Sequence, residues 1–332
     1  MAVVKADAYG HGLAAVVRAL SGMVPCFGVA NPREALVVAN HAPGDIFLLG
    51  PVLPHERSVL ASPRFVAAIS TLEEASALQA AGFPVRAHLC VDTGMGRMGC
   101  LPAQAAELLK AISGMPNIRL EGFCSHFPSA DEDAEFTNRQ ISEVRELLET
   151  LPDMGAVHLS NSAGILGFIP AQPFVTMVRP GLMLYGLCPT GAHQEDLVAV
   201  LSLRSRVTLV RTLPAGHGVS YGGTFVTSRP TKVATVGIGY ADGYPRQLSN
   251  RGAQVLLRGR RCPVLGRVTM DQIMIDVSEL PERPQPGDVV TLLGRDGAER
   301  ILATEVAAWA GTISWEILTG LTARVERVCI GS

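Results

Sequence analysis

A lysine that could carry covalent chemistry lies close to the start of the 332-residue chain. Residues 2–12 read AVVKADAYGHG, so Lys5 follows an apolar run and precedes a glycine-rich turn that carries Tyr9. Burial beside the apolar run lowers the pKa of the amine, which can then attack a carbonyl compound. A solvated lysine at a frayed terminus is the alternative, and Lys5 alone does not decide between the two.

A glycine-rich segment suggests a different chemistry. Residues 94–99, GMGRMG, match the G-x-G-x-x-G pattern of dinucleotide-binding turns, and Glu121 follows where an acidic residue would bind the ribose. This pattern is the alternative prediction, an NAD-dependent oxidoreductase. It is weakened by Pro102, which delays the following helix, and by the polar pair Asp92–Thr93 before the first glycine.

The elements that must position these residues show a repeated pattern. Eight apolar, β-rich runs begin near residues 2, 26, 45, 64, 85, 118, 156 and 174. Helical stretches alternate with them, including Thr71–Ala81, where Thr71 and Glu74 form a capping box, and Asp131–Leu151, where apolar residues recur at helical spacing. The repeats predict an α/β fold, a (β/α)8 barrel of the TIM type.

The active site of such a barrel lies at the carboxyl ends of its strands. Five candidate residues fall at these ends: Lys5, Arg97, His126, Ser162 and Arg179. After about residue 195, short Val-, Leu- and Thr-rich runs between Gly and Pro turns predict a separate, mostly β domain. The predicted domains are the barrel over residues 1–190 and the β-domain over residues 197–332, joined by the polar segment Cys188–Asp196.

Composition restricts the class of partner. Charged residues make up 17% of the chain and the net charge is −2, so no surface for nucleic acid or an anionic membrane is predicted. Seven cysteines without a C-x-x-C pair disfavour a disulfide framework or a metal site and fit a reducing compartment. No apolar run is long enough to span a membrane, and no signal peptide is evident. We therefore predict a cytoplasmic protein that binds a small molecule.

Eight motifs resemble one known family. In chain order they are AVVKADAYGHG, VDTGMGRMG, SHF, SNSAG, VRPGLMLYG, VSYGGTF, GIGYADGY and GRVTMDQ, and they are spread over residues 2 to about 330. Together they resemble alanine racemase, a pyridoxal-phosphate enzyme family with a barrel and a β-domain. The resemblance implies a homodimer with pyridoxal 5'-phosphate as cofactor, which supplies D-alanine for peptidoglycan. It also implies a longer segment before the lysine than the one present here.

Racemisation removes the Cα proton from one face of the substrate and returns a proton to the other, which requires two bases on opposite sides. The resemblance assigns one base to Lys5, which also holds the cofactor covalently, and the other to Tyr240 in GIGYADGY. An unperturbed tyrosine has a pKa of about 10, so this role requires a nearby cation or donor network. A structural tyrosine of the β-domain is the alternative interpretation of Tyr240.

The resemblance places further residues around the cofactor. His126 would lie against the ring, and Arg179 would meet the pyridine nitrogen, where a guanidinium can only donate and leaves the ring a weaker electron sink. The phosphate would bind after the seventh and eighth strands, the usual place in barrels. Its ligands would be Tyr9, Asn161, Ser162, Gly181, Leu182 and Trp315. Asn161 and Ser162 are equally typical of a helix N-cap.

The substrate carboxylate would be bound by Arg97 and by the backbone N–H of Met270, the latter from the other subunit, as is the tyrosine. Two positions depart from the family pattern. Cys90 stands where many relatives have a lysine that supports the arginine, and Trp315 replaces a phosphate-binding tyrosine. Alternatives within this fold are a broader or serine-preferring racemase and a cofactor-binding barrel without racemase activity.

Overall fold

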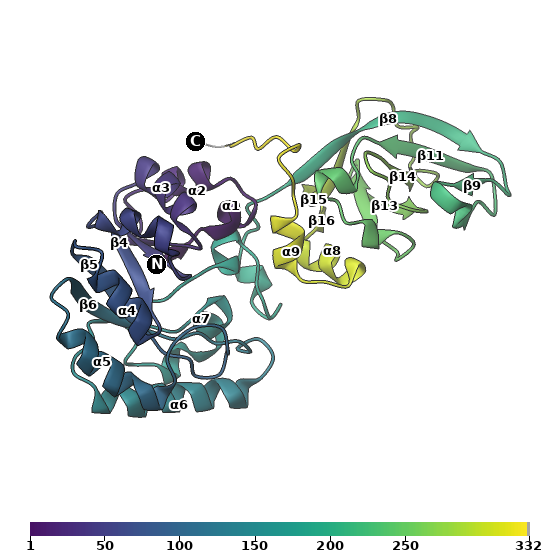
Figure 1. The fold of residues 1–332 in the computed structure, drawn as a ribbon. Coiled ribbons are helices and arrows are strands. Elements are labelled where there is room, and N and C mark those ends of the chain that lie inside the picture. Colours follow the sequence, from purple (N-terminus) through teal and green to yellow (C-terminus); the bar gives the residue numbers. More distant parts are fainter. Residues whose placement is uncertain (331–332) are drawn as a thin grey trace. The chain divides into compact units, whose positions relative to one another are not determined.

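Residues 1–330 are described by the computed structural model, and they form two compact units. Unit 1 comprises Met1–Leu184 and Cys188–Leu197, and unit 2 comprises Tyr185–Leu187 and the chain from Val198 onward. Each unit has its own main sheet, parallel in unit 1 and antiparallel in unit 2 (Figure 1). None of the described helices is long and apolar enough to cross a membrane.

A parallel sheet forms the centre of unit 1. Its seven strands pair in the order of the chain, each with the next. They are β1 (Ala2–Val3), β2 (Cys26–Val29), β3 (Asp45–Leu48), β4 (Phe65–Ile69), β5 (Val85–Cys90), β6 (Ile118–Cys124) and β7 (Ala156–His158). Most of their side chains are buried and apolar, as expected for a sheet that is covered on both faces. Seven of the eight predicted strands are therefore confirmed.

The eighth predicted run closes the barrel without forming a regular strand. The amides of Thr176 and Met177 donate to the carbonyl oxygen of Val157 on β7 at 3.0 and 3.1 Å. On the other side, the amide of Val3 on β1 donates to the carbonyl oxygen of Pro180 at 3.1 Å. Proline has no N–H to donate, so a regular ladder cannot continue through this position. An extended segment therefore takes the place of the eighth strand.

Helices connect successive strands and cover the outside of the sheet in unit 1 (Figure 1). They are α1 (Lys5–Tyr9), α2 (Leu13–Ala19), α3 (Pro32–His41), α4 (Leu72–Gln79), α5 (Ala105–Ser113), α6 (Ala134–Thr150) and α7 (Ser162–Phe168). A 3-10 helix, Pro54–Ala61, connects β3 to β4. The predicted helices over residues 71–81 and 131–151 are confirmed as α4 and α6, each slightly shorter than expected.

The capping box predicted for α4 is half correct. The hydroxyl of Thr71 accepts a hydrogen bond from the N–H of Glu74 at 3.1 Å, as expected. The carboxylate of Glu74, however, accepts from the N–H of Ser70 at 2.7 Å, one residue before the predicted donor. The side chain reaches past the cap and fixes the end of the preceding strand instead.

Unit 2 is built around an antiparallel sheet in the order β12-β13-β14-β11-β8-β15-β16, and a further pairing of β12 with β15 closes it. The strands are β8 (Leu203–Leu213), β11 (Thr231–Val236), β12 (Gln254–Leu257), β13 (Arg260–Leu265), β14 (Ile273–Asp276), β15 (Val289–Asp296) and β16 (Glu299–Ile301). A short hairpin of β9 (Gly218–Val219) and β10 (Phe225–Val226) and two helices, α8 (Ala303–Ala310) and α9 (Ser314–Thr319), complete it. The predicted β-rich C-terminal region is confirmed.

Candidate active site

Lys5 directly follows β1 and begins an unusual turn. The four residues after it, Ala6, Asp7, Ala8 and Tyr9, all have a φ of 53°. This left-handed conformation costs a residue with a side chain about 1–2 kcal/mol. The sequence suggested only a glycine-rich turn, because alanine and aspartate give no signal of four successive left-handed residues.

Two carboxylates hold this strained turn in place. Asp7 accepts a hydrogen bond from the N–H of Leu13 at 2.7 Å. Glu34, on α3, accepts from the N–H of Ala6 at 2.7 Å and from the N–H of Ala30 at 2.8 Å. Backbone strain that surrounding groups maintain is concentrated at functional sites. The turn therefore marks the region around Lys5 as functional.

The environment of Lys5 suits a reactive amine. The side chain is half-buried, and burial lowers its pKa, with the nearby cations of Arg97 and Arg179 acting in the same direction. The segment is not frayed, since the amino group of Met1 donates to the carbonyl oxygen of Val178 at 3.0 Å. The alternative of a solvated lysine at a loose terminus is therefore wrong.

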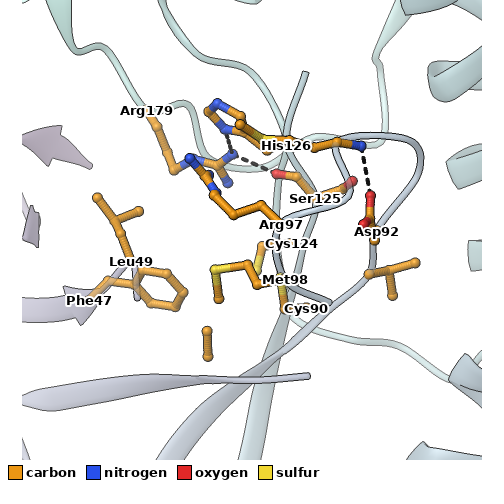
Figure 2. Close-up of a pocket in the computed structure, with 13 residues that line it drawn as sticks. Phe47, Leu49, Cys90, Asp92, Arg97, Met98, Cys124, Ser125, His126 and Arg179 are labelled. Carbon is orange, nitrogen blue, oxygen red and sulfur yellow. Dashed lines mark hydrogen bonds between the residues drawn. The ribbon is translucent and has the colours of Figure 1, made fainter. Parts of the chain in front are cut away.

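Arg179 follows the segment that closes the barrel, and it is buried. Its Nη1 donates to Nδ1 of His158 and, at 2.7 Å, to the carbonyl oxygen of the same residue. Its Nη2 donates to the carbonyl oxygens of Ser125 and Leu159 at 2.6 and 2.9 Å, and to Nδ1 of His126 at 3.2 Å (Figure 2). Within residues 1–330, Nε makes no hydrogen bond. It is the donor that remains for a ligand.

His126 lies just after β6 and is held as a neutral ring. Burial lowers its pKa to about 3, and the cations of Arg179, Arg97 and Lys5 add to this effect. Three cationic side chains thus act on one imidazole at the carboxyl ends of the barrel strands. An arrangement of this kind favours an anionic ligand.

A cavity opens at this end of the barrel, and Arg97 and Arg179 both project toward it (Figure 2). Its lining includes Cys90 and Cys124, which lie side by side in the pairing of β5 with β6. The contact with Cys124 and burial raise the pKa of the Cys90 thiol, so Cys90 stays neutral. Cys90 therefore cannot replace the charge of a group that would support Arg97.

The GMGRMG segment has a role other than dinucleotide binding. The carboxylate of Asp92 accepts hydrogen bonds from the backbone N–H groups of Gly94, Met95 and Gly96 at 2.9, 2.7 and 2.8 Å. These amides are the donors that a pyrophosphate would require. The segment is a loop that Asp92 folds and that carries Arg97 at the edge of the cavity. The dinucleotide interpretation is therefore wrong, and Asp92, part of the polar pair noted in the sequence, is the reason.

Tyr9, Ser162 and Gly181 form a polar cradle, which we call the Gly181 cradle. A Cβ atom at Gly181 would lie 2.5 Å from Oη of Tyr9, so only glycine allows the phenol to approach this closely. The hydroxyl of Ser162 accepts from the N–H groups of Gly181 and Met183 at 3.0 and 3.2 Å. The N–H of Leu182 makes no hydrogen bond within residues 1–330. The cradle can offer the two hydroxyls and this amide to an anion.

Asn161 has a structural role beside this cradle. Its side-chain oxygen accepts from the N–H of Gly164 at 3.0 Å, which caps α7, and its amide nitrogen donates to the carbonyl oxygen of Phe127 at 3.0 Å. The alternative prediction of a helix N-cap is therefore correct for Asn161. The cap also fixes the position of Ser162, the next residue.

Tyr240 and Met270, both in unit 2, lie on adjacent turns. The amide of Tyr240 donates to the carbonyl oxygen of Thr269, and the amide of Ala241 donates to the carbonyl oxygen of Met270, both at 3.0 Å. Gly239 makes this approach possible, since a Cβ atom there would overlap the carbonyl oxygens of the facing turn. Both side chains are accessible, 40% for Tyr240 and 52% for Met270. Trp315 lies on α9 of the same unit and is partly buried.

A second accessible tyrosine, Tyr221, was not singled out from its motif VSYGGTF. It is 70% exposed, and the residue before it, Ser220, has a φ of 64°. The hydroxyl of Ser220 donates to the carbonyl oxygen of Arg267 at 2.6 Å, which ties this loop to the segment that leads to Met270. The strain at Ser220 marks Tyr221 as a functional candidate. The three glycine-flanked residues of VSYGG were the available signal.

The fold and the site define a two-domain barrel protein with a reactive lysine after the first strand. Residues 1–189 match the family model of the alanine racemase N-terminal domain, and residues 200–329 match that of the C-terminal domain. The chain therefore belongs to the alanine racemase family, and the resemblance of the eight motifs is confirmed.

Similar proteins support this assignment along the whole chain. Alanine racemase from Halothermothrix orenii is 43% identical over 341 residues, which cover 98% of this chain and 89% of the relative. That from Deinococcus deserti is 43% identical over 336 residues, 98% of this chain and 91% of the relative.

Solved structures agree with the fold. Alanine racemase from Streptomyces lavendulae has a TM-score of 0.90 and 36% identity, and the match covers 100% of this chain and 90% of that chain. Alanine racemase from Bartonella henselae with covalently bound pyridoxal phosphate has a TM-score of 0.88 and 33% identity, covering 98% and 91%.

Proposed function

We propose that this protein interconverts L-alanine and D-alanine with pyridoxal 5'-phosphate as its cofactor. The observation that carries the proposal is the arrangement at one end of the barrel. A half-buried amine, an inward-facing guanidinium and the Gly181 cradle all follow carboxyl ends of strands of the same sheet. A ligand with a carbonyl group, an aromatic nitrogen and a phosphate fits these three groups.

The residues present fit the cofactor individually. Lys5 would hold its carbonyl carbon, and Nε of Arg179 would donate to the ring nitrogen, beside His126. The phosphate would bind to the Gly181 cradle, whose glycine is required by the contact with Tyr9. Trp315 would contribute only an indole N–H. When bound, pyridoxal phosphate supplies the electron sink that makes the Cα proton of an amino acid removable.

The proposed residues act on the substrate in distinct ways. Arg97, exposed at the edge of the cavity, would bind the substrate carboxylate. The lowered pKa of Lys5 keeps a larger share of the amine neutral, so that its nitrogen can take the α-proton on one face. Arg179 has no proton to accept and remains a cation, which keeps the ring nitrogen unprotonated.

The base for the opposite face is proposed to come from unit 2 of a second copy of the chain. Tyr240 is the residue predicted from the sequence, and the N–H of Met270 would assist Arg97. The strained loop and the greater exposure favour Tyr221 over Tyr240 for this role. We therefore propose a homodimer with shared sites and leave the choice between the two phenols to a direct comparison.

Isotope exchange tests the function. The protein is incubated in D2O with L-alanine or D-alanine, with and without pyridoxal phosphate, and deuterium at Cα and chirality are followed together. Exchange with loss of chirality only when the cofactor is present is the expected result. Cofactor binding without exchange would support a binding barrel that lacks racemase activity, and absence of both would reject the proposal.

The same experiment with L-serine and D-serine tests side-chain preference. A higher kcat/KM for serine than for alanine would support a serine-preferring racemase instead. The proposed place of the enzyme, in the cytoplasm as the supplier of D-alanine for peptidoglycan, fits the seven cysteines, which are all free thiols in the described part of the chain.

A further inference from the structure

The buried polar groups behind Arg179 suggest a residue whose role neither the motifs nor the comparisons assign. We propose that His88 is a positioning residue, which fixes the tautomer of His158 and through it the orientation of Arg179. This inference rests on the proposed function, because it concerns the guanidinium that would face the cofactor ring.

The three side chains form one hydrogen-bonded chain inside the barrel. Nδ1 of His88, on β5, lies 2.8 Å from Nε2 of His158, at the end of β7. Nδ1 of His158 is in turn bonded to Nη1 of Arg179. All three residues are buried, and His158 is fully inaccessible. No water has access to the hydrogen bond that His158 makes.

The donors and acceptors along this chain can be assigned without ambiguity. A guanidinium only donates, so Nδ1 of His158 must be an unprotonated acceptor. The neutral ring then carries its hydrogen on Nε2 and donates it to Nδ1 of His88. Burial and nearby arginines lower the pKa of both rings, which agrees with neutral imidazoles. His88 is therefore the acceptor that selects the required tautomer of His158.

The local backbone is shaped to place the His88 ring. The pairing of β5 with β6 shifts by one residue between Ala87 and His88, and an irregularity of this kind redirects a side chain. Opposite lies Gly122, where a Cβ atom would come within 2.6 Å of the imidazole. Phe47 packs against both rings, with centroid distances of 5.0 Å to His88 and 5.1 Å to His158.

Loss of the acceptor would change what Arg179 meets. Without Nδ1 of His88, the Nε2–H of His158 is a buried donor without a partner. The tautomer with the hydrogen on Nδ1 becomes competitive, and it presents a donor to the donor of Arg179. The guanidinium must then move, and with it the Nε that remains for the cofactor ring and the contact to His126.

Two variants separate the hydrogen bond from packing. In His88→Phe a ring of similar size remains but the acceptor is lost, whereas in His88→Asn an amide oxygen can take the place of Nδ1. For each, the ring nitrogens of the 15N-histidine-labelled apo protein are observed by NMR. Dissociation of pyridoxal phosphate, the kcat and KM for alanine, and the unfolding midpoint are measured on the same preparations.

We expect an unprotonated Nδ1 signal for His158 in the wild type and in His88→Asn, and its loss or averaging in His88→Phe. Cofactor affinity and kcat should fall by about tenfold or more in His88→Phe, with KM changed much less, and should be largely restored in His88→Asn. An Nδ1 of His158 that is protonated in the wild type would overturn the proposal. So would equal losses in both variants that follow their unfolding midpoints, since that result describes packing alone.

The failure of the proposed function would look different. A wild-type protein that binds pyridoxal phosphate but does not racemise alanine contradicts the function. The nitrogen signals of the apo protein and the cofactor affinities of the two variants would still decide the role of His88.

Discussion

Nη2 of Arg179 donates to Nδ1 of His126 at 3.2 Å, so a permanent cation holds a neutral imidazole as its acceptor. Burial and this cation together lower the pKa of His126 to about 3, and burial with Arg86 and Arg179 lowers that of His88 to about 4. The folded protein therefore contains histidines that cannot take up a proton at mildly acidic pH, although the unfolded chain can.

This difference predicts a loss of stability on acidification. Between the unfolded pKa of about 6.5 and the folded values, the unfolded state binds more protons, so the free energy of unfolding falls as the pH falls. Each such histidine should remove about 2 kcal/mol between pH 7.5 and pH 5. Denaturant unfolding at a series of pH values measures the slope. His126→Asn should make the slope shallower, and an unchanged slope would contradict the assignment of His126.

Gly181→Ala should weaken cofactor binding through the phenol of Tyr9. The new methyl group would lie 2.5 Å from Oη of Tyr9, so the phenol must leave the Gly181 cradle. We expect the dissociation constant of pyridoxal phosphate to rise about tenfold or more, measured by titration of the apo protein. Gly167→Ala on α7 is the matched control, since no atom lies within 4 Å of its Cβ position. Equal effects of the two substitutions would show that the cradle does not bind the phosphate.

The sequence predicted the parallel barrel because its strands are bounded by glycine and proline and separated by helical periodicity. It placed Lys5, His126, Ser162 and Arg179 at strand ends because the periodicity also shows where each strand stops. Position relative to a strand end can therefore be predicted from local pattern alone.

Other features depend on contacts between distant residues and leave no local signal. The capture of three backbone amides by Asp92 turns a dinucleotide pattern into an arginine-bearing loop. The hydrogen bond from His158 to His88 joins residues 70 positions apart. The boundaries of the cavity are set by several strands at once, so side-chain distances there could not be inferred from spacing.

Ala6→Gly should stabilise the protein, because Ala6 has a φ of 53°. Glycine adopts this conformation without the steric cost, and the gain should exceed its greater entropy in the unfolded state by about 0.5–1 kcal/mol. Ala106→Gly on α5 is the control and should lower the free energy of unfolding by about 1 kcal/mol. Chemical denaturation of both variants measures the difference in sign. A loss of stability in Ala6→Gly would mean that the alanine methyl group contributes packing that outweighs the strain.

The two exposed tyrosines of unit 2 can be separated by their effect on each direction of exchange. Removal of the base for one face should reduce deuterium uptake from one enantiomer by about 100-fold or more, while uptake from the other enantiomer continues through Lys5. Tyr221→Phe and Tyr240→Phe are compared under identical conditions. The strain at Ser220 leads us to expect the asymmetric loss in Tyr221→Phe. An asymmetric loss in Tyr240→Phe alone would restore the assignment made from the sequence.

Lys5→Met should abolish covalent attachment of the cofactor. The chain has three lysines, Lys5, Lys110 and Lys232, so borohydride reduction followed by peptide mass mapping identifies the modified amine directly. Only Lys5 combines a half-buried side chain with two neighbouring arginines, both of which lower its pKa and favour the neutral nucleophile. Lys110→Met, an exposed position on α5, should leave attachment unchanged. Modification of Lys110 or Lys232 in the wild type, or persistent modification in Lys5→Met, would remove Lys5 from its proposed role.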